Sequence, residues 1–201
     1  MTKLAKEGFY VVSFDSLSHG QRDSGKHSFY EIVVQNGYDV QTLIDYYEEI
    51  DLVDEKNYGV TGFSMGGLSS YWIGAYAKYR PKIIAPIASA GDYTNIFDLY
   101  LTKAVVENGI SVEEMEITEE LRTFVNDNNP ANNIAGFKDT YVLISHGMSD
   151  ELIYYNYDES FFNLLTKYGV KGELMLYENI GHQIPEEFVP YLINKFNEHL
   201  K

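Results

Sequence analysis

The chain alternates short apolar runs with longer segments in which apolar residues recur every three or four positions. Short runs of this kind are typical of strands, and the periodic segments are typical of amphipathic helices. The short runs predict strands at residues 9–14, 57–63, 82–88, 140–145 and 172–177. The periodic segments predict helices at residues 28–50, 65–79, 156–168 and 186–200, with further helical pieces between residues 94 and 126.

The alternation of strands and helices predicts the architecture. It favours the α/β class, with a mainly parallel sheet and helices on both faces. We expect a single domain over residues 1–201, because the chain can bury one substantial core and contains no repeat or low-complexity linker. The region between the third and fourth predicted strands is longer than one crossover helix needs, so residues 92–135 are expected to form a helical cap.

One strand-to-helix junction carries a candidate nucleophile. Residues 62–66 read Gly-Phe-Ser-Met-Gly and lie where the second predicted strand passes into the helix predicted at 65–79. In that setting Ser64 is expected in a strained turn with its hydroxyl above the sheet. Gly62 and Gly66 are expected where strand and helix come too close for a Cβ atom. An incidental serine in a glycine-rich turn is the alternative interpretation.

A serine nucleophile needs a base and a carboxylate that orients the base. Asp150 follows the predicted strand at 140–145, and His182 follows the strand at 172–177. Both residues therefore lie in loops at the carboxyl ends of strands. Ser64, Asp150 and His182 are the candidate catalytic residues, and they occur in the order expected of an α/β-hydrolase.

Each partner of the serine has competitors. Asp150 could instead cap the helix that follows it, and Glu151 competes for the acid role. The other histidines are His19, His27, His146 and His199. These four are predicted in loops or on a solvated helix face, which leaves His182 as the preferred base.

Together these segments resemble the serine esterases of the α/β-hydrolase superfamily, nearest to small bacterial esterases related to dienelactone hydrolase and to prolyl-oligopeptidase-like domains. The resemblance rests on the turn at 62–67, the His-Gly-x-x-Asp run that ends at Asp150, and the Gly-His pair at His182. Parts of residues 9–22 also resemble the family's fourth strand and the loop after it. The resemblance implies an α/β-hydrolase fold and an acyl-enzyme formed on Ser64, with no metal and no organic cofactor.

The beginning of the chain departs from that family. A full domain has three further strands before this point, and the loop after the third supplies one of two oxyanion donors. The resemblance thus implies an N-terminally truncated domain in which the N–H of Met65 is the one encoded oxyanion donor. Three alternatives follow for the absent third strand: strand 9–14 pairs directly with strand 57–63, a second copy fills the gap in a homo-oligomer, or the chain is part of a longer protein.

Aromatic residues near the predicted strand ends are candidates for substrate contact. They are Phe63, Tyr93, Phe97 and Tyr154. Ordinary packing is the alternative for each of them, because Phe97 and Tyr100 have the spacing of a buried helix stripe. Tyrosine is also abundant, at 18 residues, so one tyrosine near the site is weak evidence.

Composition narrows the functional class. The chain has no cysteine, which excludes disulfides, thiolate metal sites and a cysteine nucleophile. Lys and Arg number 15 against 30 Asp and Glu, and a net charge of −15 disfavours nucleic acids and anionic membranes as partners. No apolar run approaches the roughly 20 residues that span a bilayer, and the N-terminus lacks a signal-peptide core, so we expect a cytoplasmic protein.

The sequence therefore predicts a serine carboxylesterase (EC 3.1.1.-) that acts on a small-molecule ester. A peptidase that uses the same triad on short peptides is one alternative. Another is a hydrolase-like binding protein in which turnover is impaired because the oxyanion loop is absent.

Overall fold

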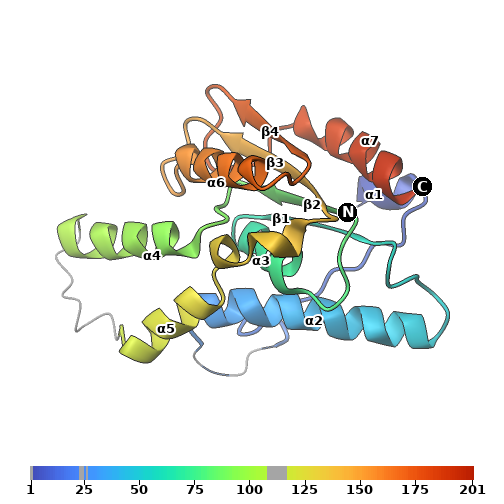
Figure 1. Ribbon diagram of the computed structural model, residues 1–201, viewed down its shortest axis with the longest axis horizontal. Coiled ribbons are helices and arrows are strands. Elements are labelled where there is room, and N and C mark those ends of the chain that lie inside the picture. The colour runs from blue at the N-terminus through green and yellow to red at the C-terminus, as the bar shows by residue number, and fades with distance from the viewer. Residues whose placement is uncertain (1, 23–24, 26, 108–116) are drawn as a thin grey trace.

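The computed structural model describes residues 2–22, 25, 27–107 and 117–201, and its core is one parallel sheet (Figure 1). The strands are β1 Gly59–Phe63, β2 Ile83–Ile87, β3 Tyr141–Gly147 and β4 Gly172–Tyr177. Their spatial order, β1-β2-β3-β4, is also their order along the chain. The predicted α/β class and parallel sheet are confirmed, and four of the five predicted strands are present.

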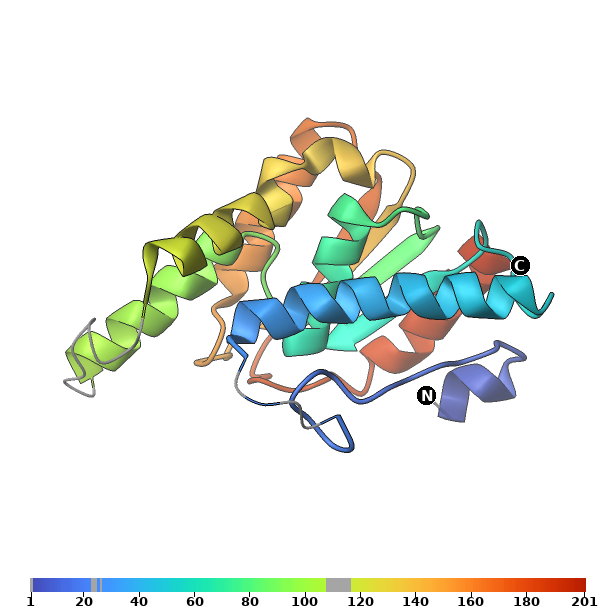
Figure 2. The ribbon, with the colours of Figure 1, turned by 90° about the horizontal axis from the view of Figure 1, so that it is seen from below.

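Helices cover both faces of this sheet. The α-helices are α1 Thr2–Lys6, α2 Phe29–Glu49, α3 Met65–Tyr76, α4 Tyr93–Thr102, α5 Glu119–Asp127, α6 Tyr155–Lys167 and α7 Phe188–Leu200. α3 and α6 lie on one face, and α1 and α7 lie on the other. α2 runs alongside α3, farther from the sheet, as Figures 1 and 2 show.

The strands can support two helix layers because successive side chains point to opposite faces of a sheet. In β3, Val142 and Ile144 pack with α3 and α6, whereas Leu143 packs with α7. All three side chains are fully buried. Such strands read as continuous apolar runs, which is why the sequence predicted them.

The segment between β2 and β3 is helical, as expected for residues 92–135. It contains α4, a π-helical turn at Lys103–Glu107, α5, and 3-10 turns at Pro130–Asn132 and Ile134–Phe137. Residues 108–116 of this segment lie outside the described residues. α4 and α5 extend together at one end of the molecule in Figure 2. The assignment of this segment as a cap remains a prediction.

The predicted strand at 9–14 is wrong, because these residues form no strand. The segment keeps part of an alternating pattern: Phe9 and Val11 are half-buried against the α7 side, while Tyr10 and Val12 are exposed. No ladder joins it to β1, whose only partner among the described residues is β2. Direct pairing of residues 9–14 with β1, one of the three alternatives above, is therefore excluded.

A charged cluster joins β3, β4 and α7 near the amino-terminal ends of these strands. The Glu173 carboxylate accepts hydrogen bonds from the hydroxyls of Tyr141 and Tyr191, and Lys195 Nζ lies 2.7 Å from it. Partial burial acts to raise the pKa of Glu173, but these three donors outweigh it and lower the pKa to about 2. Glu173 therefore favours the folded state while it is ionised.

We expect Glu173→Gln to reduce the free energy of unfolding by about 1 kcal/mol at pH 7, since about a third of this side chain is exposed and solvent screens its ion pair. The pKa of Glu173 in the fold lies below its ordinary value of 4.5. Its stabilisation is thus present above pH 4.5 and is lost as the pH falls toward 2. Urea unfolding of both proteins at pH 7 and pH 3 measures this, and the difference should shrink to less than half at pH 3. An equal difference at both values would contradict the assignment.

Candidate active site

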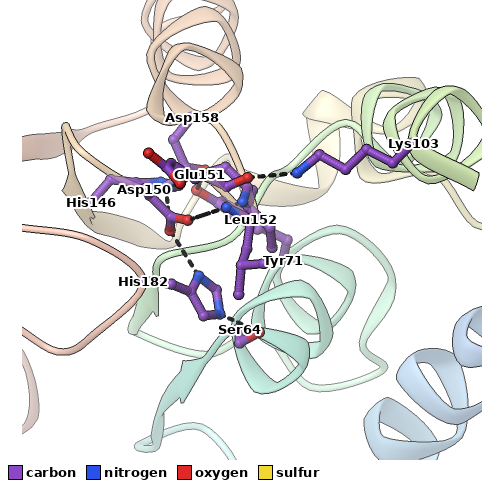
Figure 3. Close-up of polar contacts among 10 residues, drawn as sticks. Ser64, Tyr71, Lys103, His146, Asp150, Glu151, Leu152, Asp158 and His182 are labelled. Atoms are coloured by element: carbon purple, nitrogen blue, oxygen red, sulfur yellow. Dashed lines mark hydrogen bonds and ion pairs between the residues drawn. The ribbon is translucent and has the colours of Figure 1, made fainter. Parts of the chain in front are cut away.

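Three loops at the carboxyl edge of the sheet bring Ser64, Asp150 and His182 together. Ser64 follows β1, Asp150 follows β3, and His182 follows β4. His182 Nε2 lies 2.9 Å from Ser64 Oγ, and His182 Nδ1 lies 2.8 Å from Asp150 Oδ2. Figure 3 shows the imidazole of His182 between the hydroxyl and the carboxylate. The three residues that the sequence singled out thus form one continuous hydrogen-bonded chain.

Ser64 occupies the strained turn that its pentapeptide predicts. Its backbone has φ 55° and ψ −115°, a positive φ that costs a residue other than glycine about 1–3 kcal/mol. The turn is held because the N–H of Ser64 donates to Ile87 O of β2, at 2.9 Å. α3 begins at the next residue. This geometry lifts the hydroxyl of Ser64 out of the sheet edge, toward His182.

The two glycines of the pentapeptide, Gly62 and Gly66, have different surroundings. A Cβ atom on Gly62 would lie 2.1 Å from the carbonyl oxygen of Gly66, so Gly62 is required by the close approach of β1 and α3. A Cβ atom on Gly66 would meet no described atom within 4 Å. The prediction that both glycines relieve crowding is therefore correct for Gly62 and wrong for Gly66. Crowding returns at Gly67, whose Cβ would lie 2.6 Å from Ser89.

Met65 contributes the first N–H of α3. The first N–H groups of a helix have no acceptor within the helix, and the positive end of the helix dipole lies at the same point. This N–H is adjacent to Ser64, where an oxyanion formed on a Ser64 adduct needs a donor. The position suits the oxyanion role predicted for Met65.

Asp150 is fixed by its own loop. Its Oδ1 accepts hydrogen bonds from the N–H groups of Leu152 at 2.9 Å and Ile153 at 3.0 Å, and its side chain is buried. The competing N-cap role does not apply to α6, because that helix begins after Tyr154. Glu151, the competitor for the acid role, is exposed and contacts Lys103 through its carbonyl oxygen.

The loops that carry Asp150 and His182 are joined to each other. The N–H of Ser149 donates to Ile180 O at 2.8 Å, and the N–H of Met148 donates to Tyr177 O at 2.8 Å. These backbone bonds extend the pairing of β3 and β4 past the end of the sheet. They hold the loops of Asp150 and His182 at a defined distance without help from the two side chains.

The structure adds two site residues that the sequence analysis missed, His146 and Asp158. His146 was predicted in a loop, but it is the sixth residue of β3 and is fully buried. Its Nε2 lies 3.2 Å from Asp150 Oδ2, and its Nδ1 lies 2.7 Å from Asp158 Oδ2. A signal was present in the sequence, because Asp158 shares the buried stripe of α6 with Phe161 and Leu165. A carboxylate on an apolar helix face requires a buried partner.

The four side chains predicted to contact substrate differ in their exposure and in their neighbours. The Phe63 ring packs against the His182 imidazole, with 4.8 Å between ring centres. Tyr154 is 40% exposed, and Lys103 Nζ lies 5.3 Å from its ring. The assignment of Tyr93 is corrected: it is fully buried, and its hydroxyl donates to Leu68 O at 2.7 Å. Phe97 belongs to the same core but lines a surface pocket.

That pocket lies between α2, α4 and the start of α5. Its volume is about 320 Å³, and it is lined by Ser28, Phe29, Tyr30, Phe97, Tyr100, Leu101, Ile117 and Leu121. The lining contains no charged side chain. Met65, next to Ser64, packs on the same apolar cluster as Phe29 and Phe97. Met65 and part of the pocket lining therefore belong to one apolar cluster.

With this geometry described, the relatives of the chain identify its family. Residues 3–196 match the family described as the prolyl oligopeptidase family. The chain belongs to that family. Membership in the prolyl oligopeptidase family places it among the serine hydrolases of the α/β-hydrolase superfamily, in agreement with the resemblance predicted from sequence.

Individual relatives are distant in sequence but similar in fold. "Putative esterase YitV" of Bacillus subtilis (strain 168) is 23% identical over 209 residues, which cover 98% of this chain and 81% of that protein. SOBER1 of Arabidopsis thaliana superposes with a TM-score of 0.57 at 18% identity, and Pyrococcus horikoshii acylaminoacyl peptidase with 0.67 at 14%. These superpositions cover 85% and 84% of this chain. They cover 66% of the SOBER1 chain, just under two thirds, and 28% of the peptidase chain.

Two further features of the structure concern metal binding and membrane crossing. Within the described ranges, no group of three or more His, Asp or Glu side chains is arranged to hold a metal ion. The helices of these same ranges include none that is long and apolar enough to cross a membrane.

Proposed function

We propose that the chain is a serine hydrolase that cleaves carboxylic esters through an acyl-enzyme. The observation that carries this proposal is the hydrogen-bonded chain from Ser64 Oγ through His182 to Asp150. Nucleophile, base and orienting carboxylate are each within hydrogen-bond distance of the next, which is the arrangement that activates a serine.

The geometry assigns a role to each group. His182 Nε2 takes the proton of Ser64 as Oγ attacks the ester carbonyl carbon, and the N–H of Met65 donates to the developing oxyanion. The ester C–O bond then breaks, and His182 gives its proton to the departing alcohol. Water attacks the acyl-enzyme by the same steps in reverse, which releases the carboxylic acid and restores Ser64. Asp150 holds His182 in the tautomer that leaves Nε2 free to accept.

The pocket of about 320 Å³ supports an ester with an apolar acyl group. It is lined by aromatic and aliphatic side chains, and such linings bind apolar groups by desolvation. Tyr100 of this lining has a raised pKa, mainly because it is partly buried and also because the charge of Asp150 acts on it. A relative across nearly the whole chain also carries the name of an esterase.

We expect the enzyme to prefer p-nitrophenyl butyrate over acetate by about tenfold in kcat/KM, because each buried methylene contributes about 0.8 kcal/mol. Leu101→Trp, which narrows the pocket, should abolish this preference and leave acetate hydrolysis within about twofold of wild type. The matched control is Leu101→Met, which conserves volume and should keep the preference. A preference that persists in Leu101→Trp would place the acyl group elsewhere.

A peptidase is the second candidate, and the family membership favours it. The same triad would cleave an amide bond, with the departing amine in place of the alcohol. Aminoacyl and dipeptidyl p-nitroanilides test this alternative beside the esters. Faster hydrolysis of the anilides than of the esters would establish the peptidase. No turnover of either class by folded protein would favour a binding protein instead.

A further inference from the structure

The carboxylate of Asp150 faces two imidazoles. Its Oδ2 lies 2.8 Å from His182 Nδ1 and 3.2 Å from His146 Nε2. His146 contacts neither Ser64 nor the open side of the site, because its side chain is completely buried between β3 and α6. The proposed mechanism uses His182 and gives His146 no role.

The neighbours of His146 determine where its protons lie. Nε2 lies 2.9 Å from Ile153 O, and a carbonyl oxygen can only accept, so Nε2 carries a hydrogen. This N–H is directed at both Ile153 O and Asp150 Oδ2. On the other side of the ring, Nδ1 lies 2.7 Å from Asp158 Oδ2. His146 thus bridges two carboxylates, one of which is the orienting carboxylate of the site.

Asp158 is surrounded by hydrogen-bond donors. The Tyr71 hydroxyl donates to its Oδ1 at 2.5 Å, and the backbone N–H of Ser89 donates to the same carboxyl group. These two donors, both independent of His146, suit an ionised carboxylate, which accepts hydrogen bonds and has no proton to donate. With Asp158 ionised, Nδ1 of His146 is protonated as well, and the ring is an imidazolium.

Charge balance in the interior favours this state. The side chains of Asp150, His146 and Asp158 are all 0% exposed. Two buried carboxylates without a cation are very unfavourable, whereas a cation between them compensates both. Burial lowers the pKa of His146, but the hydrogen bond and charge of Asp158 outweigh it, so the net shift is upward. Burial raises the pKa of Asp158, and His146 offsets part of that shift.

The charged and titratable groups around His146 come from four elements. Asp150 lies in the loop after β3, Asp158 on α6 and Tyr71 on α3. His182, in the loop after β4, is reached through Asp150. Lys103 contacts the same loop at Glu151 O but does not bond His146.

We propose that His146 is a positioning residue, a buried imidazolium that Asp158 and Tyr71 hold against Asp150 to orient and charge-balance the triad acid. This proposal rests on the proposed function, because it assigns a second support to the same triad. The N–H of His146 restricts Asp150 Oδ2 to one orientation, in which the oxygen also receives His182. As a cation beside Asp150, His146 also offsets part of the negative charge that His182 faces.

The first test is the pH dependence of kcat/KM for p-nitrophenyl butyrate. In His146→Asn and in Asp158→Asn, the buried cation is lost. The acidic limb of the pH profile should then shift to higher pH by about 0.5–1 unit, and the maximal kcat/KM should fall roughly 10- to 100-fold. His199→Asn, on α7, is the matched histidine control and should leave both unchanged. A reduced plateau with an unmoved limb in both variants would overturn the charge role and leave only packing.

The second test needs no variant to fold and no substrate to turn over. ¹⁵N-labelled histidine in the wild-type protein should show one imidazole with both nitrogens protonated at pH 6 and protected from solvent exchange. A buried His146 with a single protonated nitrogen at that pH would overturn the proposal. This result is independent of the proposed function, whose failure would appear instead as a wild type without hydrolytic activity.

Discussion

Ser64→Ala is expected to lower kcat/KM for p-nitrophenyl butyrate by about 10⁴- to 10⁶-fold, the largest effect of any single substitution in this chain. The alanine lacks the oxygen that lies 2.9 Å from His182 Nε2, so no acyl-enzyme can form. Alanine has the same difficulty as serine at a φ of 55°, so the turn should change little in stability. The measurement is initial-rate kinetics, with circular dichroism to verify the fold.

Ser149→Ala is the matched control for this experiment. Ser149 is exposed in the neighbouring loop next to Asp150, and its structural contact is made by its backbone N–H. Its replacement should leave kcat/KM within about twofold of wild type. A fluorophosphonate probe should label wild type and Ser149→Ala but not Ser64→Ala. Undiminished turnover in Ser64→Ala, or labelling of that variant, would refute the role of Ser64.

Asp150→Asn is expected to lower kcat by about 10³- to 10⁴-fold. All four neighbours of this carboxylate are donors: the N–H groups of Leu152 and Ile153 and the imidazoles of His146 and His182. The amide nitrogen of an asparagine carries two hydrogens and is itself a donor. In either orientation of the side chain, this NH₂ group therefore faces other donors. If the amide faces His182, the imidazole is driven to the tautomer in which Nε2 can no longer accept from Ser64.

This variant should also unfold more easily, by about 1–3 kcal/mol, because a buried donor is left without an acceptor. Kinetics and urea unfolding on the same preparation separate the two effects. Glu151→Gln is the control that addresses the competing acid, since Glu151 is exposed and keeps its side chain away from His182. Near-wild-type rates are expected for Glu151→Gln, and a loss comparable with that of Asp150→Asn would transfer the acid role to Glu151.

Much of the fold could be predicted because parallel strands buried on both faces leave a strong signal. β2 is a continuous apolar run and β3 begins with one, and α2 carries its buried residues at helical spacing behind a Ser28–Glu31 capping box. The candidate site could be predicted for a similar reason. Strand, turn and helix around Ser64 require glycine at position 62, and the strand-end loops after β3 and β4 carry Asp150 and His182.

The wrong predictions have one origin. The hydrophobic period and the composition of a segment do not show which parts of the chain pack against it. Residues 9–14 have the composition of a strand, yet a strand exists only where a second backbone supplies the ladder, and no described residue pairs with them. Tyr93 is an aromatic residue near a strand end, as a substrate contact would be, yet its hydroxyl donates a hydrogen bond to Leu68 O in the core. Gly66 belongs to the motif, yet no described atom crowds it.

By itself, then, the sequence determined the α/β class, the helix boundaries to within a few residues and the three residues of the candidate triad. These features depend on local patterns: hydrophobic period, a steric requirement at a turn, and side-chain chemistry at the end of a strand. Only the tertiary structure decided that His146 and Asp158 lie behind Asp150, that residues 9–14 stay unpaired and that Met65 packs on the apolar cluster to which part of the pocket lining belongs. Each of these depends on which distant groups share a dry interior, where an unpaired charge is too costly and every donor needs an acceptor.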